Sequence, residues 1–225
     1  MQNNLIRPSF SPYRSSTFLV RNHNEEKKNK VRIVINYKRL NDNTYDDAYK
    51  IPNKDSLINS IQGCKYFSQL DCKSGFWQIR LEEDSKPLAT FLCPRGLYEW
   101  NVMPFGLKNV PQIFQRMMDN IFSKYYIYIY IDDILVFSYT FQEHIKHLEF
   151  IFEELISHEL IVSKKKLKLF KTQIEFLGDP VYFQEKTFEI LNNLRCPKHQ
   201  DFKWYKNMFL VKFMARPYCG SHYWK

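Results

Sequence analysis

The sequence contains little glycine and fewer acidic than basic residues. It has 6 glycines in 225 residues, where an average protein has roughly 7%. The 24 Asp and Glu residues are outnumbered by 33 Lys and Arg residues, which leaves a net charge of +9. A hydrophobic share of 44% is enough for a packed core and excludes a disordered chain. The positive charge and the 17% aromatic content favour a polyanionic partner, with nucleic acid first.

Long apolar runs, paired cysteines and export signals are also absent from the sequence. No stretch reaches the roughly 18 apolar residues of a membrane helix, and the amino terminus lacks the basic start and apolar stretch of a signal peptide. The 5 cysteines are irregularly spaced and do not indicate a disulfide framework. We therefore expect a soluble intracellular chain, cytoplasmic or nuclear, with reduced thiols and no membrane contact.

Short strands and two helices alternate irregularly along the chain, which favours an α+β fold. Strands are predicted over residues 31–36, 66–71, 77–81, 88–93, 98–102, 126–131, 134–138, 167–170 and 174–177. Apolar residues at helical spacing predict helices over residues 111–122 and 141–156, and Pro111 fits the first turn of the former. We expect a loop over residues 41–49 and expect Pro180 to end any strand after Gly178.

Two adjacent aspartates interrupt the most apolar part of the sequence. Asp132 and Asp133 stand between two predicted strands, which indicates a tight acidic turn. Burying two carboxylates there is unfavourable unless a cation neutralises them, and hard ions such as Mg²⁺ prefer oxygen ligands. The chain's other such pair, Asp46 and Asp47, lies in a polar loop where solvated charge explains it.

A third carboxylate, Asp71, ends the predicted strand 66–71. If this strand pairs with the aspartate hairpin, Asp71 meets Asp132. Three carboxylates at a sheet centre can hold two Mg²⁺ ions for in-line phosphoryl transfer. The alternative is that Asp71 only caps the following turn, and spacing alone favours neither interpretation.

Five segments resemble motifs of the reverse transcriptases of long-terminal-repeat retrotransposons and plant pararetroviruses, in the family's order. They are V-R-I-V-I-N-Y-K-R-L-N (31–41), F-S-Q-L-D-C-K-S-G-F-W-Q-I (67–79), M-P-F-G-L-K-N-V-P-Q-I-F-Q (103–115), Y-I-D-D-I-L-V-F-S (130–138) and F-L-G (176–178). The amino-acid sequences of residues 21–30 and 96–109 are most similar to those of the caulimovirus and badnavirus branch.

This resemblance implies a right-hand polymerase with a central antiparallel sheet in its palm. The fingers would comprise residues 1–50 and 79–109, and the palm residues 51–78 and 110–190. Residues 191–225 do not follow the family pattern, so we expect a thumb that is missing or degenerate. Family polyproteins carry a protease before this domain and a ribonuclease H after it, and we expect this chain to be a polyprotein fragment.

The activity that the resemblance implies is RNA-directed DNA polymerisation, a nucleotidyl transfer that adds deoxynucleotides to a primer 3′-end. Asp71, Asp132 and Asp133 would be the catalytic residues and the ligands of two Mg²⁺ ions, with Mn²⁺ as an alternative. The partners would be an RNA or DNA template with its primer, together with deoxynucleoside triphosphates.

The resemblance also implies which residues contact the substrates. The expected nucleotide contacts are Arg32, Phe76, Phe105, Gly106 and Lys166. The expected primer and template contacts are Phe176, Leu177, Gly178, Lys164 and Lys165. Arg32 would bind the triphosphate, assisted by one lysine of Lys27, Lys28 and Lys30. Phe76 would exclude a ribose 2′-hydroxyl, and without the resemblance it would be taken for an ordinary core aromatic.

Two other functions stay open at this point. The chain could be an inactive, truncated remnant of an integrated element that at most binds nucleic acid, which the unmatched tail and Asp179-Pro180 favour. An RNA-dependent RNA polymerase is disfavoured, because Phe76 replaces a small or polar gate residue and the hairpin sequence is Y-I-D-D.

The tail contains a second candidate metal site, with zinc as the metal. Its ligands would be Cys196, His199, Cys219 and His222. The order Cys-His followed by Cys-His is not a common zinc-finger arrangement, so coincidence is the default interpretation.

Overall fold

The computed structural model describes residues 4–20, 32–53, 57 and 60–182, which form two compact units. The described residues of the first unit lie within 4–52, 72–121 and 130–132. Those of the second unit lie within 53–71, 122–129 and 133–182. None of the helices in the described part of the chain is long and apolar enough to cross a membrane.

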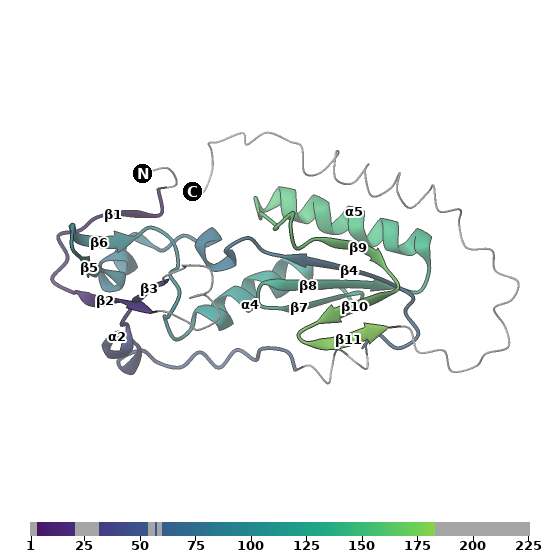
Figure 1. Cartoon of the computed structure of the whole chain (residues 1–225), viewed down its shortest axis with the longest axis horizontal. Helices are drawn as coiled ribbons and strands as arrows, with labels where there is room; N and C mark the ends of the chain where they lie inside the picture. The colour runs from purple at the N-terminus through teal and green to yellow at the C-terminus, as the bar shows by residue number, and fades with distance from the viewer. Residues whose placement is uncertain (1–3, 21–31, 54–56, 58–59, 183–225) are drawn as a thin grey trace, which may run out of the picture. The chain divides into compact units, whose positions relative to one another are not determined.

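The first unit contains a five-stranded sheet in the order β1-β6-β5-β2-β3 (Figure 1). Its strands are β1 (Ile6–Pro8), β2 (Ser15–Val20), β3 (Arg32–Ile35), β5 (Phe91–Cys93) and β6 (Gly96–Trp100). Neighbouring strands are antiparallel except β2 and β5, which are parallel. Tyr37, just after β3, is buried and donates its hydroxyl to the Ala89 carbonyl at 2.9 Å. This bond ties the end of β3 to the segment that leads into β5.

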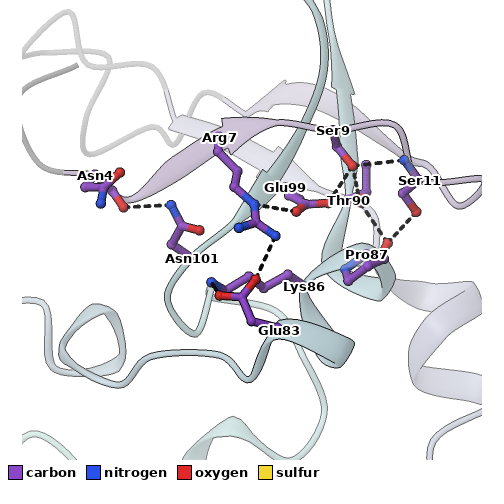
Figure 2. Close-up of polar contacts among 10 residues, drawn as sticks. All are labelled: Asn4, Arg7, Ser9, Ser11, Glu83, Lys86, Pro87, Thr90, Glu99 and Asn101. Atoms are coloured by element: carbon purple, nitrogen blue, oxygen red, sulfur yellow. Dashed lines mark hydrogen bonds and ion pairs between the residues drawn. The ribbon is translucent and has the colours of Figure 1, made fainter. Parts of the chain in front are cut away.

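A polar network ties β1 to β6 and to the 3₁₀ helix η2 (Glu83–Ala89) (Figure 2). Arg7 on β1 donates from Nε to Oε1 of Glu99 on β6 at 2.7 Å, and its Nη2 lies 2.9 Å from Glu83. Burial alone would raise the pKa of Glu99, but hydrogen bonds from Ser9 and Arg7 outweigh burial and lower it. Glu99 therefore stays ionised at neutral pH and holds β1 against the sheet.

The described residues of the first unit include three further helical segments, α2 (Lys38–Asp42), the 3₁₀ helix η1 (Gly75–Gln78) and all but the last residue of α4 (Val110–Phe122). Pro111 is the second residue of α4, as predicted, because the first turn of a helix does not need its missing N–H. The buried residues of α4 recur at helical spacing. They are Val110, Phe114, Gln115, Met118 and Phe122.

The second unit is built on a four-stranded sheet in the order β7-β8-β4-β9, with a separate hairpin β10-β11 (Figure 1). The strands are β4 (Tyr66–Asp71), β7 (Ile127–Tyr130), β8 (Asp133–Ser138), β9 (Lys168–Lys171), β10 (Gln173–Phe176) and β11 (Asp179–Tyr182). Tyr130 at the end of β7 belongs to the first unit. Strand β8 is buried from its second residue to its last, which explains an apolar run without alternation.

Helix α5 (Phe141–Ser157) packs against β8 and β4 of this sheet. It begins at a capping box, in which Thr140 Oγ1 accepts from the Glu143 N–H and Glu143 accepts from the Thr140 N–H. Its buried face includes His144, whose ring nitrogens lie 2.7 Å from Ser68 Oγ on β4 and 2.8 Å from Ser138 Oγ on β8. These hydrogen bonds join α5 to both central strands.

Most predicted elements are confirmed, but four expectations are wrong. Residues 77–81 were expected to form a strand, and they form the end of η1 and a single bridge at Arg80. The first part of the strand expected over 88–93 belongs to η2 instead. Helix α2 extends into the loop expected over 41–49. In the first case, Trp77 packs against Trp100, a residue distant in sequence, which no local pattern reveals.

The fourth wrong expectation concerns Pro180, which does not end the strand after Gly178. Pro180 lies in β11, opposite Glu175 of β10. Among the described residues β10 and β11 form a two-stranded sheet, so one side of β11 has no neighbouring strand in this part of the chain and a missing N–H donor can be tolerated there. The expectation that the thumb is missing or degenerate concerns residues 191–225, which lie outside the described residues. The assignment of segments to fingers and palm stays a prediction.

Candidate active site

Asp71 and Asp133 lie opposite each other at the ends of β4 and β8, in the second unit. Burial raises the pKa of Asp133, and the negative charge of Asp71 raises it further. A hydrogen bond from Gln69 and the charges of Lys166 and Lys168 oppose the rise without cancelling it. The arrangement therefore places two mutually repelling carboxylates at one end of a buried strand pair, where a cation would relieve the repulsion.

The sequence left open whether strand 66–71 pairs with the aspartate hairpin, and the two strands do pair. The register partner of Asp71 is Asp133. The reason is that the turn consists of Ile131 and Asp132, so Asp133 is already the first residue of β8.

Lys166 forms an ion pair with one member of this carboxylate pair, Asp71. Its Nζ lies 2.6 Å from Oδ2 of Asp71. The main chain brings it there, because the Ser163 N–H donates to the Asp71 carbonyl at 2.8 Å and the Lys166 N–H donates to the Ser163 carbonyl at 3.1 Å. The turn before β9 is therefore attached to the end of β4, and the lysine ammonium neutralises part of the acidic charge.

Asp132 lies in the first unit, against the segment that follows β4. The Cys72 N–H donates to the Asp132 carbonyl at 2.8 Å. A Cβ atom added to Gly75 would lie 2.1 Å from Oδ1 of Asp132 and 2.8 Å from Cζ of Phe114. Only glycine fits at position 75 with the Asp132 carboxylate in this place.

The expected nucleotide contacts of the first unit include an aromatic cluster. The ring of Phe76 lies 5.2 Å from that of Phe105 and 5.5 Å from that of Phe114. Phe105 is half exposed, and Gly106 next to it has φ +96°, a conformation that favours glycine. Arg32 is exposed at the start of β3, where its register partner is Val20. The structure therefore brings Phe76 and Phe105 together, within the same unit as Arg32 and Asp132.

The expected primer and template contacts lie in the second unit. Phe176, at the end of β10, is buried and its ring lies 6.1 Å from that of Tyr128. Leu177 and Gly178 have φ +54° and +84° and form the tight turn to β11, as in a type I′ hairpin. Lys164 and Lys165 are exposed in the turn before β9. Phe176 is thus a core residue, whereas Leu177, Gly178, Lys164 and Lys165 lie in turns.

Some predicted ligands cannot be placed. Lys27, Lys28, Lys30 and the candidate zinc ligands Cys196, His199, Cys219 and His222 lie outside the described residues. Within residues 4–20, 32–53, 57 and 60–182, no group of three or more His, Cys, Asp or Glu side chains is arranged to hold a metal ion.

One buried polar residue on each of the helices α4 and α5 was missed by the sequence analysis. His144 lies on the apolar face of α5, four residues before Leu148, and Gln115 lies on that of α4, three residues before Met118. Polar residues at core spacing in a helix are the signal that could have identified both, since a buried polar group needs a partner.

Known proteins resemble this chain in sequence. Residues 20–181 match the family described as reverse transcriptase (RNA-dependent DNA polymerase). The chain is 51% identical over 176 residues to the enzymatic polyprotein of cauliflower mosaic virus (strain Strasbourg), covering 77% of this chain and 26% of the polyprotein. It is 47% identical over 187 residues to polyprotein P3 of Commelina yellow mottle virus, covering 79% of this chain and 10% of that protein.

Solved structures of foamy viral protease-reverse transcriptase share the fold. One in complex with double-stranded DNA has a TM-score of 0.73 at 22% identity and covers 92% of this chain and 37% of its own. Another in complex with an RNA/DNA hybrid has a TM-score of 0.72 at 22% identity, with coverages of 91% and 28%. These likenesses confirm the predicted α+β polymerase fold.

The chain spans about a quarter of the length of the cauliflower mosaic virus polyprotein. The predicted resemblance to plant pararetrovirus enzymes is confirmed by these relatives, and the family match covers well over half of the chain. This chain belongs to the reverse transcriptase (RNA-dependent DNA polymerase) family.

Proposed function

We propose that this chain is a polymerase core that adds deoxynucleotides to a primer 3′-end on an RNA or DNA template. The observation that carries the proposal is the opposed pair Asp71 and Asp133 at the ends of β4 and β8. A raised pKa of Asp133, caused by burial and by the charge of Asp71, marks a place where a cation is favoured.

The donor chemistry fits hard divalent ions, Mg²⁺ first and Mn²⁺ as an alternative. Carboxylate oxygens are the ligands that these ions prefer. Asp71 and Asp133 provide them, and Asp132, adjacent to Asp133 in the chain, is proposed to provide the third carboxylate. When bound, two such ions lower the pKa of the primer 3′-hydroxyl and neutralise charge on the triphosphate.

The remaining proposed roles belong to side chains of the two units. Lys166, paired with Asp71 in the structure, is proposed to move its ammonium to the departing pyrophosphate. Arg32 binds the triphosphate with a guanidinium that is exposed on β3. Phe76 excludes a 2′-hydroxyl, and its contacts with Phe105 and Phe114 keep the ring from moving aside.

Template and primer binding is the second part of the proposal. The net charge of +9 and the exposed Lys164 and Lys165 favour contacts to phosphates. Relatives of known structure were solved with double-stranded DNA and with an RNA/DNA hybrid, which supports the same partners for this chain. The turn at Leu177 and Gly178 is proposed to meet the primer.

Primer extension on an RNA template, with Mg²⁺ and deoxynucleoside triphosphates, tests the proposal. We expect extension by the parent chain and its loss in the Asp132→Asn and Asp133→Asn variants. Asp46→Asn is the matched control, since Asp46 belongs to the other Asp-Asp pair and is an exposed partner of Lys108. Extension should be unchanged in this control.

Two outcomes would contradict parts of the proposal. If the pure, folded parent chain extended no primer with Mg²⁺ or Mn²⁺, the polymerase assignment would be wrong and the inactive-remnant alternative would stand. If the parent chain incorporated ribonucleotides as readily as deoxynucleotides, the gate role of Phe76 would be wrong.

A further inference from the structure

The turn that carries Asp132 contains a strained residue. Ile131 has φ +53°, in the left-handed region. Six described residues other than glycine have a positive φ, and Ile131 is the β-branched one among them. A β-branched side chain is the least suited to this region, because its Cβ substituents crowd the neighbouring carbonyl groups. Something in the surroundings must therefore hold Ile131 in place.

Gln115, buried on α4, provides a specific contact to this turn. Its Oε1 accepts a hydrogen bond from the Ile131 N–H at 2.8 Å, and its Nε2 donates to Oδ1 of Asp119 at 2.9 Å. A carboxylate accepts hydrogen bonds and donates none, so the amide NH₂ group must face Asp119. The amide oxygen must consequently face Ile131, and the opposite orientation of the amide would lose both bonds.

The far end of this chain of hydrogen bonds is anchored as well. The Tyr49 hydroxyl donates to Oδ2 of Asp119 at 2.7 Å. Arg116 donates to Oδ2 of Asp47 at 2.7 Å, and its guanidinium lies 4.9 Å from the centre of the Tyr49 ring. Asp119 is therefore held between Gln115 and Tyr49, and it cannot turn away without breaking bonds at both oxygens.

We infer that Gln115 is a positioning residue for Asp132, acting through the main chain of Ile131. Asp132 follows Ile131 directly, and on its other side it meets Gly75, where there is no space for a Cβ atom. If the Ile131 bond were lost, the turn would relax towards a negative φ and the Asp132 carboxylate would move. In the polymerase reaction proposed above, on which this role rests, a displacement of 1 Å can lower the rate about 100-fold.

The first experiment uses Gln115→Leu, which removes both hydrogen bonds. We expect kcat for primer extension to fall at least tenfold while KM for the deoxynucleotide changes less than twofold. Amide hydrogen exchange at Ile131 should accelerate at least tenfold. Asn120→Leu, at an exposed position of the same helix, is the matched control and should change neither quantity.

A second substitution separates positioning from general destabilisation. Glycine adopts a positive φ without strain, so Ile131→Gly added to Gln115→Leu should recover at least a third of the parent kcat. A purely structural role of Gln115 predicts a further loss instead. If Gln115→Leu does not fold, Tyr49→Phe replaces it, because this change removes only the hydroxyl that holds Asp119, and it should lower kcat by a smaller factor.

The outcomes distinguish this inference from the proposed function. Unchanged exchange at Ile131, or accelerated exchange with unchanged kcat, would overturn the positioning role in an active enzyme. If the parent chain extends no primer, the proposed function fails, and exchange at Ile131 alone then decides whether Gln115 holds the turn.

Discussion

Lys166 and Asp71 form an ion pair in which Nζ of the lysine lies 2.6 Å from Oδ2 of the aspartate. The Asp71 side chain is only 13% exposed, whereas that of Lys166 is 66% exposed. The lysine therefore reaches from solvent to a largely buried carboxylate. In the proposed reaction, a bound cation and the lysine ammonium compete for the same oxygen.

We predict that Lys166→Met lowers the Mg²⁺ concentration needed for half-maximal extension. The decrease should be about twofold to fivefold, because an ion pair this exposed contributes at most about 1 kcal/mol. At saturating Mg²⁺ the maximal rate should still fall, since the charge near the departing pyrophosphate is gone. A Mg²⁺ titration of the extension rate measures both. Lys165→Met, at the neighbouring exposed position, should leave the Mg²⁺ midpoint unchanged.

Asp133→Asn should stabilise the metal-free protein while abolishing extension. The pKa of Asp133 is raised above its ordinary value of 3.8, by burial first and by Asp71 next. Below pH 3.8 the group is protonated in both the folded and unfolded states, and the destabilising effect of its charge develops as pH rises through the folded-state pKa. We expect the melting temperature at pH 7 in EDTA to rise by about 2 to 4 °C, with a smaller rise near pH 4. An equal rise at both pH values would contradict this account.

Gly75→Ala should lower the extension rate about 100-fold, since the new Cβ would occupy the space of Oδ1 of Asp132. The lower rate would result from displacement of the Asp132 carboxylate and not from the loss of an interaction of residue 75. Single-turnover extension measures the chemical step, and circular dichroism checks that the fold persists. Ser74→Ala, at the exposed neighbouring position, serves as the control. Wild-type rates in Gly75→Ala would show that the Asp132 carboxylate can take another position.

His144 should make the second unit sensitive to mild acid. Burial, with a smaller contribution from His147, lowers the pKa of His144 from 6.5 to about 3. Below pH 6.5 the unfolded chain binds a proton that the folded chain excludes, so stability is full above pH 6.5 and decreases as pH falls towards 3. Between pH 7 and pH 5 we expect a loss of roughly 2 kcal/mol in the free energy of unfolding.

Urea unfolding at pH 7 and pH 5 tests this acid sensitivity. His144→Gln, which cannot be protonated, should lose less stability over this interval than the parent chain. His158→Gln, at an exposed position after α5, should retain the parent pH dependence. If both variants respond to pH as the parent does, another group causes the acid sensitivity.

Some features of the fold could be predicted because they depend on local sequence. Strand β4 matches its predicted range over residues 66–71, and α5 differs from its prediction by one residue, because short apolar runs and the helical spacing of apolar residues are local signals. Residues 77–81 were misassigned because Trp77 is covered by residues distant in sequence, which no local pattern reveals.

Some residues of the candidate site could likewise be predicted from the sequence, and others could not. Asp71, Asp132 and Asp133 could be singled out from sequence, since charged residues beside apolar strands are unusual and the motifs around them resemble one family. Gln115 was not singled out, because a polar residue at a core position of a helix indicates burial but not what its amide contacts. Its importance appears only when Ile131, sixteen residues later in the chain, lies against it.

The sequence by itself determined the family and most of the strands and helices, and it singled out the three acidic residues, because periodicity and motif spacing are properties of neighbouring residues. The tertiary structure alone decided that the register partner of Asp71 is Asp133 and that Lys166 pairs with Asp71. Strand register depends on where a turn ends and on how opposite faces pack. A shift of one residue in that turn, which the sequence does not reveal, changes which carboxylates meet.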